Sequence, residues 1–101
     1  MKSVELKGQG GSSLVFFGEL IASVEALNHD DTVRCSMHLY RENHAYICQR
    51  VDRPNTIDVR YRVERCADVL SVYQFFGTEP LANYLYGITK LSVPGLRQKI
   101  I

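Results

Sequence analysis

The chain has 101 residues, of which 46% are hydrophobic and 23% are charged, and its formal net charge at pH 7 is +1. This length suits one globular domain over residues 1–101. A net charge near zero excludes a strong overall field that would draw the protein onto nucleic acid or an anionic membrane. Because no run of about 18 apolar residues exists and no signal peptide is evident, we expect no membrane association.

The first third of the chain predicts strands. Residues 4–7 have the pattern of a short strand, and the glycine- and serine-rich segment 8–13 that of a loop. Residues 14–27 fit two structures, because their apolar positions suit a strand, whereas a stripe within 18–27 also suits an amphipathic helix. The strand is favoured, since the segment starts with a β-rich run and Gly18 suits a bend or bulge.

Three further segments, 32–41, 45–51 and 57–65, alternate apolar and polar residues with the period of a strand. Turn residues separate them, including Pro54 and Asn55 before the last strand. The alternation predicts that one set of side chains points inward, toward the helices: Val33, Cys35, Met37, Leu39, Ala45, Ile47, Val51, Ile57, Val59, Tyr61 and Val63. The residues between them, Cys48 included, are then expected on the outer face.

At Cys66 the period changes to that of a helix, which is expected over 67–76 and to end at Gly77. Thr78 is the predicted N-cap of a second helix, whose Leu81, Leu85 and Ile88 are expected to face the core. Residues 92–95 break that helix, and residues 96–101 are expected either to add a helical turn or to dock on a partner. The predicted fold is therefore α+β: a four- to five-stranded antiparallel meander followed by two C-terminal helices packed on one face.

No segment commits the chain to a chemistry. The glycine-rich loop lacks the Lys and the helix start of a phosphate loop. Cys35 and His38 have metal-like spacing, but residues three apart on a strand point to opposite faces, so neither a metal nor another cofactor is expected. Cys48 and His38 form the best nucleophile–base pair available, yet nothing orients them, and no enzyme activity is expected. The odd, widely spaced cysteines favour a reducing, cytoplasmic location.

The outer face of the predicted sheet is the candidate binding surface. Residues 34–65 carry seven arginines against four acidic residues, whereas residues 1–33 have a net charge of −3. The strand order places on one face Arg34, His38, Tyr40, Tyr46, Arg50, Arg60 and Arg62. Arginine and tyrosine on an open sheet can bind nucleic acid or a protein, although a solvated face with cross-strand ion pairs has the same composition.

Assembly is the second functional expectation. Residues 14–27 are apolar on both faces, and two helices cover only one side of a sheet. The other side is then covered by a partner subunit, a folded-back N-terminus or the C-terminal tail, whereas a helix over 18–27 would allow a monomer. We expect a small accessory or interaction protein that acts as a homodimer. The alternatives are a nucleic-acid-binding protein or a small-ligand sensor with a pocket lined by Phe75, Phe76 and Tyr84.

Overall fold

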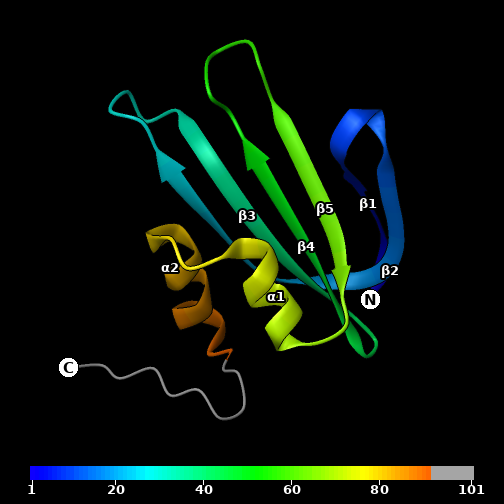
Figure 1. The fold of residues 1–101 in the computed structure, drawn as a ribbon. Helices are drawn as coiled ribbons and strands as arrows, with labels where there is room; N and C mark the ends of the chain where they lie inside the picture. Colours follow the sequence, from blue (N-terminus) through cyan, green and yellow to red (C-terminus); the bar gives the residue numbers. More distant parts are fainter. Residues whose placement is uncertain (92–101) are drawn as a thin grey trace, which may run out of the picture.

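The computed structural model describes residues 1–91 and shows one curled sheet of five antiparallel strands, followed by two helices (Figure 1). Each strand pairs with its neighbour in sequence, in the order β1-β2-β3-β4-β5, so the predicted α+β meander is confirmed. The predictions for residues 92–101 fall outside the described residues. The elements are β1 (Lys2–Lys7), a 3-10 turn (Gln9–Gly11), β2 (Ser13–Leu27), β3 (Val33–Glu42), β4 (Ala45–Asp52), β5 (Arg60–Cys66), α1 (Val69–Phe76) and α2 (Pro80–Thr89).

Strand β2 bends where it changes partners. Its first part pairs with β1, from Ser13 to Gly18, and its second part pairs with β3 from Glu19 onward. The strand predicted over 14–27 is therefore confirmed, and the helix is not formed. Gly18 is required at the change of partner, because a Cβ atom there would lie 2.3 Å from the carbonyl oxygen of Arg41 and 3.0 Å from the Phe16 ring.

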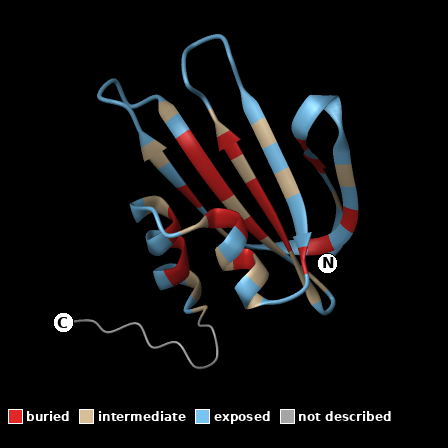
Figure 2. Ribbon diagram, in the orientation of Figure 1, coloured by how far each residue is buried: buried red, intermediate tan, exposed pale blue. Residues whose placement is uncertain are grey.

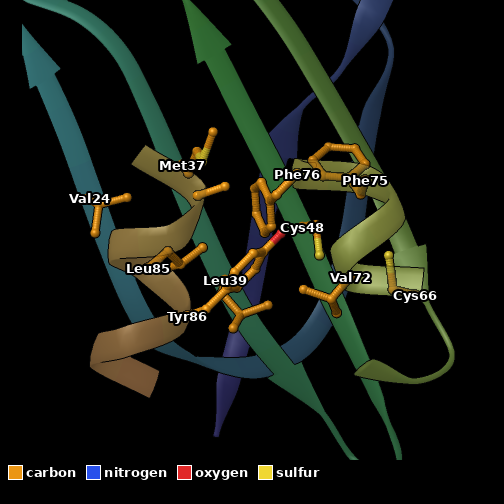
Figure 3. Packing of buried hydrophobic residues seen from close by; sticks show 11 residues of the cluster. Val24, Met37, Leu39, Cys48, Cys66, Val72, Phe75, Phe76, Leu85 and Tyr86 are labelled. Atoms are coloured by element: carbon orange, nitrogen blue, oxygen red, sulfur yellow. The ribbon is translucent and has the colours of Figure 1, made fainter. Parts of the chain in front are cut away.

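Two hydrophobic cores lie on opposite faces of the sheet. The larger one joins β2, β3, β4 and β5 to both helices and includes Val24, Met37, Leu39, Cys48, Cys66, Val72, Phe75, Phe76, Leu85 and Tyr86 (Figure 3). The smaller one forms where the β1–β2 hairpin curls over the other face, and it includes Leu6, Phe16 and Ile47. The folded-back N-terminus thus covers part of the face that the helices leave open, and β3 and β4 are buried on both sides (Figure 2).

The predicted facing of β4 and β5 was wrong, whereas that of Cys35, Met37 and Leu39 is confirmed. In the observed register Leu39 lies opposite Cys48, so Cys48 faces the helices, and Ile47 points into the smaller core. On β5 the helix-facing residues are Arg62, Glu64 and Cys66, and the opposite face carries Tyr61 and Val63. The side chains alternate between the two faces of the sheet as predicted. Because a hydrophobic core covers each face, an apolar residue does not identify the helix-facing side.

The last strand starts later than predicted. β5 begins at Arg60, and Ile57 in the preceding loop is 87% exposed. The Asn55 side-chain oxygen accepts hydrogen bonds from the backbone N–H groups of Ile57 and Asp58. An Asn side chain that accepts hydrogen bonds from the next backbone N–H groups stabilises a turn. The N–H groups of Ile57 and Asp58 are then not available to pair with a neighbouring strand.

Both helices have identifiable ends. The Asp68 carboxylate caps α1 by accepting a hydrogen bond of 2.9 Å from the backbone N–H of Ser71, which lowers the pKa of Asp68. Gly77 ends α1 with a φ of 78°. The N-cap of α2 is Glu79, not the predicted Thr78, and it makes no side-chain capping bond; Pro80 occupies the first helical turn.

Side-chain hydrogen bonds to backbone carbonyls attach α1 to the sheet and α2 to the end of α1. The Arg62 guanidinium donates a hydrogen bond to the Phe75 carbonyl and lies 4.3 Å from the centre of the Phe75 ring. The Tyr86 hydroxyl donates to the Gly77 carbonyl at 2.6 Å, and burial raises the pKa of Tyr86. Within residues 1–91, neither helix has the length and apolar character needed to cross a bilayer.

Candidate interaction site

The register divides the seven residues of the predicted binding face between two sides of the sheet. His38 and Tyr40 lie on the side away from the helices, opposite Gln49 and Ile47 on β4. The helix-facing side carries Tyr46, Arg50, Arg60 and Arg62, and Arg34 lies at the start of β3. The seven residues therefore do not share one face, although four of them remain on the helix-facing side.

Several of these side chains are engaged within the protein. The Tyr40 ring packs edge-on against Phe16, with the ring centres 5.4 Å apart, in the smaller core. The Arg41 guanidinium lies 5.7 Å from the centre of the Tyr46 ring. Together with the bonds of Arg62 to Phe75, these contacts give the side chains structural roles.

The candidate nucleophile–base pair is also separated by the sheet. Cys48 is fully buried on the helix-facing side, whereas His38 lies on the other side, 3.2 Å from the Ser36 hydroxyl. Burial lowers the pKa of His38, with an opposing effect from Glu25. Within residues 1–91, no three His, Cys, Asp or Glu side chains are grouped closely enough to hold a metal ion.

The most prominent surface feature is the open edge of β2, which we call the β2 edge and define as residues 19–27. This part of β2 pairs with β3 on one side, and β1 stops pairing at Gly18 on the other (Figure 1). Within the described part of the chain, no strand pairs with this edge. Leu20, Ile21 and Leu27 are exposed along it, at 52%, 38% and 51%.

The composition of the β2 edge leaves it weakly protected against pairing. Natural edge strands are often guarded by lysine, proline or bulges. β2 contains no Lys, Arg or Pro, and its only charges are Glu19 and Glu25. Two register shifts, between Leu20 and Ala22 and between Ala26 and Leu27, leave residues 22–26 as a regular stretch. The outer edge of these five residues is therefore available to another strand.

A groove lies beside this edge, between α2 and the ends of β2, β3 and β4, and has a volume of about 830 Å³. We call it the α2 groove. Its apolar lining comes from β2 and α2: Val24, Ala26, Leu27, Leu81, Tyr84 and Ile88. Phe75 and Phe76, predicted to line a ligand pocket, are buried in the larger core instead, so only Tyr84 of the three lines this groove.

The polar part of the α2 groove is an ion-pair network around Arg50. Its guanidinium donates to Asp52 at 3.0 Å and also contacts Glu79 at the start of α2. Burial alone would lower the pKa of Arg50, but the hydrogen bonds to the two carboxylates outweigh it and the pKa is raised. Asp52 and Glu79 are each about two-fifths exposed, and both line the groove.

Cys35 lines the same groove, and its thiol should react slowly. Burial raises its pKa to about 11, although Arg50 opposes this shift. The thiol therefore stays protonated at pH 8, and the thiolate is the reactive form. We expect iodoacetamide to label Cys35 at least about tenfold more slowly in the folded protein than in guanidinium chloride. Mass spectrometry would measure this, and rapid labelling of Cys35 at pH 8 would contradict the burial.

No protein-family model, curated protein or solved structure matches this chain. The apolar residues on both faces of segment 14–27 predicted covered faces, whereas the open β2 edge follows from the order of the strands in the sheet. The α2 groove had no signal in the sequence, since its lining comes from β2, β3, β4 and α2 without a motif.

Proposed function

We propose that the protein is a small interaction protein that acts as a homodimer through its sheet. The observation that carries this proposal is the β2 edge, which no described strand covers and along which Leu20, Ile21 and Leu27 are exposed. Strand addition at such an edge satisfies main-chain hydrogen bonds and buries apolar side chains in one step. The three cysteines are free thiols, which suits the cytoplasmic location that forms part of the proposal.

Light scattering coupled to gel filtration tests this proposal directly. We expect wild-type protein to show twice the 11.5 kDa mass of one chain. The double variant Leu20→Lys/Leu27→Lys adds edge charges and should raise the dissociation constant at least about tenfold, equivalent to about 1.4 kcal/mol.

The matched control is Val15→Lys/Phe17→Lys. These residues are each 60% exposed on the same strand, but they lie where β1 already pairs with β2. The control should keep the wild-type mass. A wild-type protein that stays monomeric at concentrations up to about 1 mM would overturn the proposal.

The α2 groove favours a second candidate function, the binding of a small amphipathic molecule. Its volume and its mostly apolar lining with one polar cluster are typical of ligand sites. The cluster offers two kinds of partner: the Asp52 and Glu79 carboxylates suit an amine, and the Arg50 guanidinium suits a carboxylate.

Thermal-shift measurements with dodecylamine and with dodecanoate distinguish these two head groups. We expect one of them to raise the melting temperature, and Tyr84→Ala, which removes a groove wall, to abolish the shift. Leu70→Ala is the control, because Leu70 is exposed on α1 and lies outside the groove lining. A lack of shift with both compounds would rule out this function.

The nucleic-acid hypothesis loses part of its geometric basis. It required all the arginines and tyrosines of the predicted face to share one open side, whereas the register moves Tyr40 to the side away from the helices. Two of the remaining arginines, Arg50 and Arg62, are already bonded within the protein, so fewer cationic groups are free for a phosphate backbone.

A further inference from the structure

We infer that two copies of this chain pair antiparallel through residues 22–26 of β2, about a two-fold axis at Val24. The inference rests on the proposed function and adds the interface and its register. A two-fold interface must be self-complementary, with the same segment contributed by both subunits. The β2 edge meets this requirement better with the axis at Val24 than with the axis at a neighbouring residue.

The positions of the bulges favour the axis at Val24. At the first register shift the extra residue is Ile21 of β2, whereas at the second it is Arg34 of β3. A bulge bends a strand and disrupts the ladder, so a straight partner can follow β2 only from Ala22 onward. An axis at Val24 pairs residues 22–26 of one copy with the same residues of the other, whereas an axis at Ser23 brings the bulged Ile21 into the ladder.

The charges of the edge favour the same register. An axis at Glu25 would place two glutamates opposite each other, and an axis at Ala22 would place Glu19 opposite Glu25 of the second copy. Like charges directly opposite each other destabilise a strand pair. With the axis at Val24, Glu25 lies opposite Ser23 of the second copy, whose hydroxyl can donate a hydrogen bond to the carboxylate. This pair occurs twice by symmetry.

On the helix-facing side of the same pairing, the side chains are small and apolar. Ala22 lies opposite Ala26 of the second copy, and the two Val24 side chains meet at the axis. Val24 already packs in the larger core with Leu85 of α2. Tyr84 and Ile88, 64% and 51% exposed, line the groove between α2 and this edge, so they extend the apolar surface that a second copy covers.

Cysteine cross-linking tests the register. Ser23 and Glu25 are both exposed, and in this register each lies directly opposite the other in the second copy. Directly opposite residues have Cα atoms about 4.5–5.5 Å apart, within the range of a disulfide. The two Ser23 residues would be diagonal neighbours, about 7–8 Å apart, which is too far without backbone movement.

The experiment uses Ser23→Cys protein, Glu25→Cys protein and an equal mixture of the two, each oxidised with glutathione disulfide. Two protein thiols then form one disulfide and release two glutathione thiols. On non-reducing gels we expect several-fold more covalent dimer in the mixture than in either variant alone. Wild-type protein controls for the buried native cysteines, and circular dichroism verifies that both variants fold.

The alternative results separate this inference from the proposed function. Efficient cross-linking of Ser23→Cys alone would place the axis at Ser23 and overturn the register. A dimeric mass without cross-linking in any sample would place the interface elsewhere, while homodimer formation stands. A monomeric mass in light scattering would overturn both.

Discussion

Replacing Gly18 with alanine is expected to destabilise the protein by about 3 kcal/mol, the upper part of the range for overpacking. The new methyl group would lie 2.3 Å from the Arg41 carbonyl oxygen and would also press on the Phe16 ring. The oxygen belongs to the backbone of β3, so relief requires β2 and β3 to separate at the bend. Chemical denaturation monitored by circular dichroism measures the loss.

Alanine at Gly87 is the matched control, and it should stabilise the protein rather than destabilise it. Gly87 lies in α2, and a Cβ atom there has no neighbour within 4 Å. Alanine favours a helix over glycine by about 0.5–1 kcal/mol, so Gly87→Ala should stabilise the protein slightly. Equal effects at the two glycines would show that the close approach at Gly18 is not a real constraint.

Replacing Cys48 with aspartate is expected to cost more than about 4 kcal/mol and to leave the protein largely unfolded. Cys48 is fully buried between β4 and the helices, where a carboxylate would be removed from solvent. This substitution separates the observed register from the predicted one, in which Cys48 lies on the outer face and aspartate would be tolerated. Circular dichroism and thermal melting report the outcome.

Two controls accompany Cys48→Asp. Phe17→Asp places the same carboxylate on a strand residue that is 60% exposed and lies opposite Ser3, and it should change stability by less than about 0.5 kcal/mol. Cys48→Ala keeps the site apolar and should cost only about 1 kcal/mol, because little volume is removed. A folded Cys48→Asp protein with wild-type stability would refute the burial of this strand face.

Most element types followed from the sequence because most segments had a clear local period, although residues 14–27 also fitted a helix. The β-rich start of β2 and the helical spacing after Cys66 are local signals, and the five strands and two helices formed where those signals lay. Segment 57–59 was the exception. The side chain of Asn55 bonds the backbone there, so the loop continues to Arg60 despite a strand-like alternation.

The facing of β4 and β5 did not follow from the sequence, because facing is a property of the whole sheet. Ile47 and Cys48 are both fully buried, one on each side of β4. No local sequence pattern predicts that the β1–β2 hairpin curls back over the sheet and buries Ile47. The prediction that all seven Arg, Tyr and His residues share one face was wrong for the same reason. For residues 14–27, the apolar residues on both faces predicted a covered second side, and the folded-back β1 supplies part of that cover.

The alternate burial of β4 has a consequence for how the molecule unfolds. Successive residues of this strand enter different cores, Ile47 beneath the hairpin and Cys48 beneath the helices. A fluctuation that loosens either layer removes contacts from the strand on which the other layer depends. The hairpin and the helices share no sequence, yet through β4 they form one cooperative unit, so residues 1–91 are expected to melt in a single transition.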